Sequence, residues 1–172
     1  HREYRKHEDF DFGSSLTDRY DGEIAYADHH FGRLFDWMDK SGRINDTMIV
    51  IMADHGESLG ERGFYKHSSQ LYDEQLRIPM IIYVPGLPPR RVPSYVSSVD
   101  LGPTILDLVG LQHPSEYQGV SLSPLMRGEP FDHPPVYAEQ TYTQGNPYVR
   151  PERNLLRETK KYMVITQDGF KL

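Results

Sequence analysis

The sequence has no cysteine among its 172 residues. The chain can therefore form no disulfide and can hold no metal through thiolate sulfur, and its cellular compartment stays undecided. It also has no apolar run that approaches the roughly 20 residues of a membrane-spanning helix. We expect no membrane span, and the 37% hydrophobic and 12% aromatic content is typical of a globular chain with a real core.

Basic runs are absent as well. The 19 Lys and Arg residues are outnumbered by 25 Asp and Glu residues, which gives a formal net charge of −6, and the cations are scattered among the acids. A nucleic-acid-binding protein needs a basic face, so this charge pattern argues against a nucleic-acid partner. An anionic substrate would have to be held locally by a few well-placed cations.

The first periodic segment spans residues 16–40, where apolar residues recur at spacings of three and four. This spacing predicts an amphipathic helix. Ser15 followed by Asp18 predicts a capping box at its start, and Gly42 supplies the stop signal. Residues 48–52 are five apolar residues without alternation, which favours a strand covered on both faces, as in a parallel sheet.

Helix-like and strand-like patterns continue to alternate further along the chain. A short helix is predicted over residues 68–76, and it must end before Pro79. Residues 80–84 read as a second buried strand. Residues 99–109 form the next predicted helix, with Asp100 as its cap.

The composition turns to Pro, Gly and Ser over residues 114–135, which indicates a boundary. Three strand-like runs follow, at residues 136–140, 154–158 and 161–166. We therefore predict an α/β fold in two parts. Residues 1–125 form part of a mostly parallel sheet flanked by helices, and residues 126–172 form a small antiparallel subdomain.

The first chemical signal is Asp54 followed by His55, directly after the predicted strand at residues 48–52. In open α/β sheets, ligands bind beyond the carboxyl ends of the strands. Gly56 permits a sharp backbone turn, so the carboxylate and the imidazole can converge on one cation. One oxygen and one nitrogen ligand suit a divalent metal of intermediate hardness. The alternative is a helix cap followed by a surface histidine.

The second signal is a cluster of cations at Arg62, Lys66 and His67, just before the helix predicted from Ser68. A helix amino terminus attracts anions through its unpaired N–H groups. Lys66 and His67 would there hold a phosphate or sulfate group and protonate or stabilise a departing oxygen. The alternative is a solvated basic loop with Ser68 or Ser69 as an ordinary cap.

Other catalytic motifs are missing from the sequence. It has no Gly-rich phosphate loop, no zinc-protease helix and no Gly-x-Ser-x-Gly elbow. Thr104 is better explained as a helix-start residue than as a nucleophile. His29 and His30 fit packing or solvent exposure on the long helix, and His113 and His133, in proline-rich loops, give no signal.

Four stretches in collinear order carry a family resemblance. They are YDGEIAYAD at residues 20–28, ADHGE with LGERG within residues 53–63, LYDEQLRIPMIIYVPG at residues 71–86, and VDLGPTILDLVG at residues 99–110. Together they resemble the carboxy-terminal half of the sulfatase family, within the alkaline phosphatase superfamily. The resemblance covers nearly the whole chain, and four motifs in sequence are far more specific than any one of them.

The resemblance implies an alkaline-phosphatase-like fold and a hydrolase of sulfate or phosphate esters. The expected cofactor is a divalent metal, either calcium or manganese, zinc or magnesium, and Asp54 and His55 correspond to two of its ligands. Many relatives place a substrate-contacting lysine in the next loop, where this chain has His67 with Lys66 adjacent. His1 begins the sequence HREY, which resembles a His-x-Pro-Tyr element that carries a histidine near the leaving group.

The family's nucleophile is absent from this sequence. That nucleophile is a formylglycine made from Cys or Ser in a Cys/Ser-x-Pro-x-Arg motif, preceded by acidic metal ligands, and no such motif occurs here. We expect the formylglycine to lie outside this chain, in a missing amino-terminal part of the domain. The chain alone should then be inactive, since no covalent intermediate can form. Family habit leans towards a secreted, periplasmic or lysosomal setting.

These observations leave three hypotheses for the function. The leading one is a fragment of a metal-dependent sulfatase that acts on an anionic small-molecule or glycan ester. The second is a phosphodiesterase, phosphonate hydrolase or phosphoryl transferase of the same superfamily, which His55 mildly favours because calcium-using sulfatases commonly carry Asn at that position. The third is a non-catalytic module that binds a partner or an anionic glycan.

Overall fold

The computed structural model describes residues 8–67, 70–140, 160–169 and 171. These residues fall into two compact units. The first unit comprises His1–Lys66 and Ile78–Gly86, and the second comprises His67–Arg77 and Leu87–Leu172. This division does not follow the boundary near residue 125 that the composition predicts, and that boundary stays a prediction.

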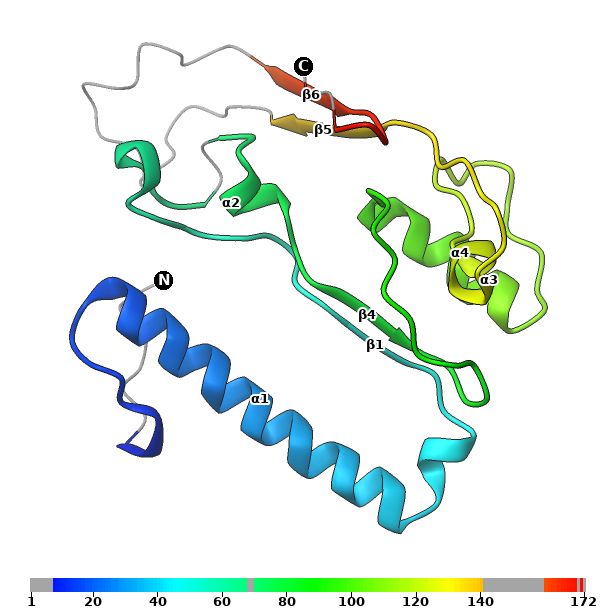
Figure 1. Cartoon of the computed structure of the whole chain (residues 1–172), viewed down its shortest axis with the longest axis horizontal. Helices are drawn as coiled ribbons and strands as arrows, with labels where there is room; N and C mark the ends of the chain where they lie inside the picture. The colour runs from blue at the N-terminus through cyan, green and yellow to red at the C-terminus, as the bar shows by residue number, and fades with distance from the viewer. Residues whose placement is uncertain (1–7, 68–69, 141–159, 170, 172) are drawn as a thin grey trace. The chain divides into compact units, whose positions relative to one another are not determined.

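The first unit holds one long helix and two small antiparallel sheets (Figure 1). Its elements are η1 (Glu8–Phe10), α1 (Leu16–Lys40), η2 (Arg43–Asn45), β1 (Ile49–Met52), β2 (Ser58–Leu59), η3 (Glu61–Gly63), β3 (Tyr65–Lys66) and β4 (Met80–Tyr83). The chain reverses through η2 after α1, and β1 returns towards the amino-terminal end of that helix (Figure 1). Within the described residues, no helix is long and apolar enough to cross a bilayer.

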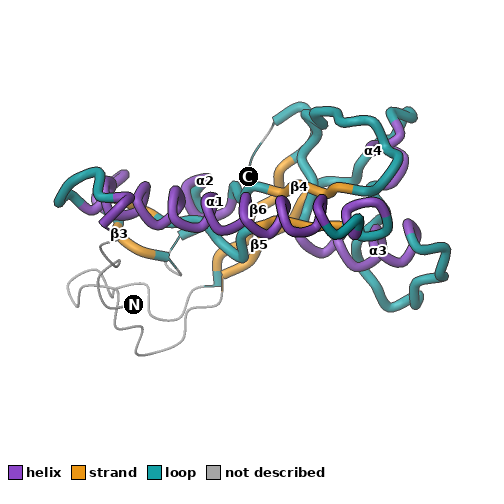
Figure 2. Tube along the Cα trace, turned by 90° about the horizontal axis from the view of Figure 1, so that it is seen from below, coloured by secondary structure: helices purple, strands orange, loops and turns teal. Residues whose placement is uncertain are grey.

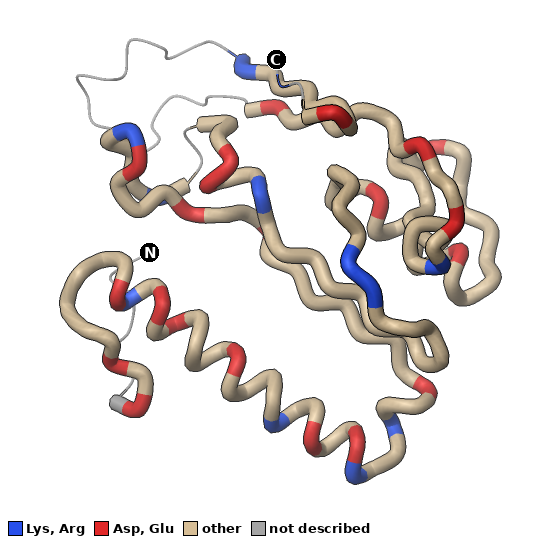
Figure 3. Tube along the Cα trace, viewed as in Figure 1, with Lys and Arg blue, Asp and Glu red and all other residues tan. Residues whose placement is uncertain are grey.

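Helix α1 confirms the sequence prediction at both of its ends. The Ser15 hydroxyl accepts the Asp18 backbone N–H at 3.0 Å, and the Asp18 carboxylate accepts the Ser15 backbone N–H at 3.0 Å. These hydrogen bonds hold the pKa of Asp18 below its ordinary value. Gly42 follows with a φ of 74°, a left-handed conformation that glycine adopts at little cost. Figure 3 shows acidic and basic residues interspersed along this helix, as expected for a solvated face.

Strands β1 and β4 form an antiparallel pair, with Ile49 opposite Tyr83 and Met52 opposite Met80. The mostly parallel sheet predicted from the sequence is therefore not confirmed by the described strands. Full burial on both faces is also not found: β1 is half-buried throughout, and Ile81 of β4 is 59% exposed. A two-stranded ribbon lacks the neighbouring strands and covering helices that would bury such apolar residues.

The second unit contains short helices linked by long loops, with one hairpin (Figure 2). Its elements are α2 (Asp73–Leu76), η4 (Ser98–Asp100), α3 (Leu101–Leu108), α4 (Ser123–Arg127), β5 (Val136–Gln140) and β6 (Lys161–Ile165). The helix predicted over residues 99–109 is confirmed. The helix predicted over residues 68–76 is shorter than expected, because α2 begins only at Asp73.

Strands β5 and β6 pair antiparallel, with Val136 opposite Ile165 and Gln140 opposite Lys161. This pairing confirms the antiparallel arrangement predicted for the carboxy-terminal segment. The third predicted strand, at residues 154–158, lies outside the described residues. Met163 and Ile165 of β6 are buried, so one face of the hairpin belongs to the core of this unit.

Asp100 and His133 form the buried polar centre of the second unit. Both side chains are 3% exposed, and the His133 Nε2 atom lies 2.9 Å from the Asp100 carboxylate. That carboxylate also accepts the backbone N–H groups of Ser97 at 2.6 Å and Val120 at 2.9 Å. Asp100 thus does more than cap a helix, because it fixes three separate segments around itself.

A backbone contact at Gly119 yields a stability prediction. A Cβ atom at Gly119 would overlap the Val99 carbonyl oxygen and would lie 2.8 Å from the Asp100 backbone nitrogen. Gly119→Ala should therefore lower the free energy of unfolding by about 1–3 kcal/mol, as overpacking does. Gly32, inside α1, has no atom within 4 Å of such a Cβ, and Gly32→Ala should raise stability by about 0.5–1 kcal/mol. Urea unfolding measures both changes in the free energy of unfolding. A change of the same sign and size at the two positions would contradict the account.

Candidate metal and anion site

Asp54 and His55 follow β1 at the point where the strand ends. The Asp54 side chain is 88% exposed, and one of its carboxylate oxygens accepts the His55 backbone N–H at 2.9 Å. The other carboxylate oxygen lies 3.7 Å from the Nε2 atom of His55. The two neighbouring side chains therefore converge, as the sequence predicts, instead of pointing to opposite faces as they would on a straight strand.

The backbone next to His55 fixes which nitrogen of the ring faces Asp54. The Nδ1 atom lies 2.8 Å from the Gly56 carbonyl oxygen, which can only accept a hydrogen bond. A neutral ring that donates from Nδ1 carries its lone pair on Nε2, the atom that faces the Asp54 carboxylate. Such a carbonyl partner is how proteins orient metal-binding histidines, so Gly56 contributes its oxygen to the site.

This donor set fits a divalent cation. A carboxylate oxygen and an imidazole nitrogen 3.7 Å apart can both reach one ion at the roughly 2.0–2.4 Å that such metals require. Two acceptor atoms so close together also repel each other unless a cation or a proton lies near both. Among the described residues, no group of three or more His, Asp or Glu side chains is placed to hold a metal. Asp54 and His55 can therefore supply only part of a ligand shell.

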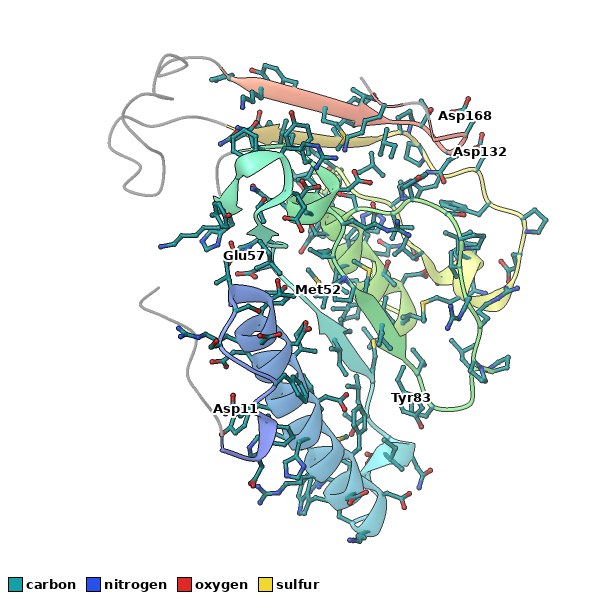
Figure 4. The ribbon with its side chains drawn as sticks, turned by 60° about the vertical axis from the view of Figure 1, so that its left-hand side comes forward. Asp11, Met52, Glu57, Tyr83, Asp132 and Asp168 are labelled. Carbon is teal, nitrogen blue, oxygen red and sulfur yellow. The ribbon has the colours of Figure 1, made fainter. Side chains whose placement is uncertain are left out.

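Glu57 follows His55 by two residues and acts on the Tyr20 side chain of α1, and sequence reasoning singled out neither residue. Burial raises the pKa of the half-buried Tyr20 phenol, and the negative charge of Glu57 adds to the effect. Figure 4 shows Glu57 close to the amino-terminal end of α1, the helix that carries Tyr20. In the sequence, Tyr20 belongs to the apolar stripe of that helix and opens the YDGEIAYAD stretch, and neither feature marks it as a site residue. The sequence signal that could have identified Glu57 is its position three residues after Asp54.

Lys66 lies on β3 in a tight hairpin with β2. It has a φ of 69°, and Arg62 has a φ of 52°; both values are unusual for residues other than glycine. Hydrogen bonds from backbone N–H groups hold the pKa of the Glu61 carboxyl below its ordinary value. The largest effect comes from the N–H of Glu61 itself, and the next from the N–H of Leu59. The prediction that Lys66 and His67 stand at a helix amino terminus is wrong, because the left-handed turn at Lys66 is followed by a helix only from Asp73.

His67 begins the second unit, and its placement against Asp54 and His55 stays a prediction. His1 lies outside the described residues. His133, which has no distinguishing signal in the sequence, is instead one of the most buried polar residues. Thr104 is fully buried and donates to the Asp100 carbonyl oxygen at 2.6 Å, a structural role and not that of a nucleophile.

Comparison with known proteins places this chain in a family. The sulfatase family model matches residues 1–111, and the model for the carboxy-terminal region of N-sulphoglucosamine sulphohydrolase matches residues 60–172. The chain therefore belongs to the sulfatase family. Asp54 and His55 fall within the first match, and the β5–β6 hairpin falls within the second.

Individual relatives agree with this family. The chain is 36% identical to an N-acetylglucosamine-6-O-sulfatase of Bacteroides thetaiotaomicron over 108 residues, which are 62% of this chain and 19% of that protein. It is 33% identical to a choline-sulfatase of Rhizobium meliloti over 112 residues, or 63% of this chain and 22% of that protein. The chain thus spans about a fifth of the length of these two relatives.

A solved structure confirms the likeness of fold. The phosphonate monoester hydrolase of Silicibacter pomeroyi superposes on 91% of this chain with a TM-score of 0.76 and 30% identity, and the match covers 32% of that protein. A second structure, of a protein in complex with its substrate D-glucosamine-2-N,6-O-disulfate, covers 91% of this chain with a TM-score of 0.66 and 26% identity. The fold is therefore α/β and alkaline-phosphatase-like.

Proposed function

We propose that the chain is the carboxy-terminal part of a metal-dependent sulfatase that hydrolyses sulfate esters of a small molecule or glycan. One observation carries the proposal: within the sulfatase match, the strand β1 ends in a carboxylate and an imidazole that converge to 3.7 Å. A surface ion pair alone would not require the carbonyl of Gly56 to orient the ring towards its partner.

Asp54 and His55 would hold the metal, and the donor set suits calcium, manganese, zinc or magnesium. A divalent cation bound here would polarise the sulfate oxygens and lower the pKa of an attacking hydroxyl. Asp54 supplies negative charge at the end of β1, and His55 supplies a nitrogen ligand whose orientation is fixed by the backbone. Neither residue needs to move a proton for this role.

Lys66, His67 and His1 remain the candidates for contact with the substrate. A cationic side chain would steady the equatorial oxygens of the sulfate group, and an imidazole would donate a proton to the leaving oxygen. The left-handed backbone at Lys66 supports a role in a site, since such strain is concentrated where function requires a particular geometry.

The rest of the catalytic domain would supply what the chain lacks. We place there the formylglycine nucleophile, the acidic ligands that complete the metal shell, and the strands and helices that would flank β1 and β4 and cover their exposed faces. The exposed Ile81 and the half-buried β1 support this arrangement, because apolar strand faces in a stable α/β sheet are covered. We call this chain joined to that remaining part the full-length protein.

The substrate would carry a sulfate group on a sugar or another small alcohol. Two named relatives support this class, one by its name as an N-acetylglucosamine-6-O-sulfatase and one by its bound glucosamine disulfate. A phosphonate or phosphodiester hydrolase is the second candidate, and the 0.76 TM-score with a phosphonate monoester hydrolase favours it. A binding module without catalysis is the third.

An assay of the full-length protein separates these functions. We expect release of 4-nitrophenol from 4-nitrophenyl sulfate, with kcat/KM at least about 100-fold above that for phenyl phosphonate monoesters, a difference of about 3 kcal/mol in transition-state binding. The reverse ranking would favour the phosphonate hydrolase. No turnover of sulfate, phosphate or phosphonate esters by the metal-loaded protein would contradict both enzyme functions and leave the binding module.

A further inference from the structure

Residues 87–93, with the sequence LPPRRVP, form a basic loop after β4, which we call the arginine loop. Residues 88–93 are all exposed, and the two cations of the loop are the neighbouring Arg90 and Arg91. No Asp or Glu occurs between Glu74 and Asp100, although acidic residues outnumber basic ones in the whole chain. Figure 3 shows the loop as a basic stretch on the segment that follows β4. The loop therefore offers an anion a positive segment on an acidic chain.

The Arg90 side chain fixes the middle of the arginine loop to α4. Its Nη1 atom donates a hydrogen bond of 3.1 Å to the Leu125 carbonyl oxygen of that helix. The guanidinium lies so close to Gly128 that a Cβ atom there would overlap it. A carbonyl oxygen carries no net charge, so the contact fixes the position of Arg90 without neutralising it. The acid next to Gly128, Glu129, already pairs with Arg127 at 2.7 Å.

The chain is fixed again just after the loop, at Tyr95. The Gln167 side chain accepts the Tyr95 backbone N–H at 3.0 Å and donates to the Tyr95 carbonyl oxygen at 2.8 Å. A pair of hydrogen bonds to one residue fixes direction as well as distance. Gln167 follows β6, whose first residue, Lys161, donates from Nζ to the Gln70 side-chain oxygen at 2.7 Å. The loop therefore leads to a hairpin that is itself held in place.

Arg91 lies between these two fixed points. Three prolines, Pro88, Pro89 and Pro93, restrict the backbone on either side of it. A backbone that is already restricted loses little conformational freedom when it binds a ligand. The guanidinium donates hydrogen bonds in a planar fork, which matches two oxygens of one oxyanion such as a sulfate group. Arg91 is thus an exposed, pre-organised cation of the kind that binds an anionic ligand.

The chain presents an aromatic side chain close to these cations. Tyr95 is 40% exposed and follows Arg91 by four residues. Four extended residues span at most about 14 Å, a distance that a few linked sugars can cover. A tyrosine ring packs against the apolar C–H face of a sugar, and its hydroxyl can still hydrogen-bond to water or ligand. A sulfated sugar has both an anionic group and such an apolar face, whereas free sulfate has only the charge.

The chain enters the arginine loop from the end of β4 that is remote from Asp54. Met80, the first residue of β4, is opposite Met52, which lies two residues before Asp54. Tyr83, the last residue of β4, is opposite Ile49 at the start of β1. We therefore assign the loop no part in holding the reacting ester at the metal.

We propose that the arginine loop, with Arg91 as its central cation and Tyr95 as its aromatic contact, is a binding site for a sulfated polysaccharide. This proposal rests on the proposed function, in which the substrate is a sulfate ester of a sugar. The loop binds sulfate groups further along the polymer, which the acidic residues of the chain would otherwise repel. The site thus raises the affinity for a polymeric ligand and leaves the hydrolysis of a small sulfate ester unaffected.

Binding of dextran sulfate to the full-length protein tests the proposal, by titration calorimetry at about 20 mM NaCl, where surface charges are weakly screened. Arg91→Glu should lower the affinity by about tenfold, because it replaces an attractive charge with a repulsive one. Arg91→Gln removes the charge without reversing it and should lower the affinity by about threefold. Arg43, an exposed arginine of η2, provides the matched control. Arg43→Glu makes the same change in net charge and should lower the affinity by less than about twofold.

A second ligand tests the aromatic contact. Tyr95→Ala keeps the backbone groups that Gln167 binds and should lower the affinity for dextran sulfate by about threefold. The affinity for poly-glutamate, an acidic polymer without sugar rings, should not change in this variant. An equal loss for both polymers would assign the loop to an acidic protein partner and overturn the polysaccharide.

The activity of the same variants separates this proposal from the proposed function. Arg91→Glu should leave kcat/KM for 4-nitrophenyl sulfate unchanged. Equal losses of dextran sulfate affinity in Arg91→Glu and Arg43→Glu would overturn the proposal, because the effect would then follow net charge alone. An unmutated protein that binds dextran sulfate through Arg91 but does not hydrolyse 4-nitrophenyl sulfate would overturn the proposed function and leave the binding site.

Discussion

Replacement of Asp54 by alanine in the full-length protein should abolish stoichiometric metal binding and lower kcat/KM for sulfate esters by at least about 100-fold. Residues that only hydrogen-bond to a metal-binding side chain commonly contribute about 10- to 100-fold to metal affinity, and a residue that binds the metal directly contributes more. Asp54 is the carboxylate of the converging pair, and its side chain is 88% exposed. Its loss should therefore affect the metal far more than the fold.

Metal content by mass spectrometry and urea unfolding measure the two consequences of Asp54→Ala separately. We expect the metal to be lost and the free energy of unfolding of the metal-free protein to change by less than about 0.5 kcal/mol, as for other surface changes. Asp46 is an exposed aspartate in the turn before β1, and Asp46→Ala should leave metal content and activity unchanged. A full complement of metal in Asp54→Ala would remove Asp54 from the site.

Replacement of Asp100 by alanine should have the largest effect on stability, a loss of about 3–5 kcal/mol in the free energy of unfolding. The change leaves the part-buried backbone N–H groups of Ser97 and Val120 without their acceptor, and it removes the carboxylate that contacts the buried His133. Each donor so abandoned costs about 1–3 kcal/mol. Urea unfolding monitored by circular dichroism gives the value.

Two further variants make the Asp100 test specific. Asp100→Asn keeps an acceptor oxygen in nearly the same shape and should cost less than Asp100→Ala. Asp132, the exposed neighbour of His133, offers a control, and Asp132→Ala should change stability by less than about 0.5 kcal/mol. A loss below about 1 kcal/mol for Asp100→Ala would contradict the role assigned to the buried centre.

The elements that the sequence predicted well are those set by local chemistry. Helix α1 begins at the capping box of Ser15 and Asp18 and ends before Gly42, because both signals act within a few residues of the backbone that they stabilise. The antiparallel arrangement of the carboxy-terminal strands also follows from short strand-like runs. The convergence of Asp54 and His55 was predicted from a turn directly after the strand, since adjacent residues on the strand itself would point apart.

What the sequence could not predict depends on partners distant in the chain. The antiparallel pairing of β1 with β4 involves strands whose apolar runs look the same for either direction. His133 stands in a proline-rich loop, and only its contact with Asp100, 33 residues earlier, reveals that it is buried. The link from Lys161 to Gln70 spans 91 residues and has no local sequence signature. Long-range side-chain contacts of this kind require coordinates.

The most direct test of the account is the position of the metal itself. Crystals of the full-length protein grown with Mn²⁺ should give an anomalous scattering peak within about 2.0–2.6 Å of both an Asp54 carboxylate oxygen and the His55 Nε2 atom. The same map should show the His55 Nδ1 atom still bound to the Gly56 carbonyl oxygen. A metal peak bound by other residues, with Asp54 and His55 turned away from it, would contradict the central claim.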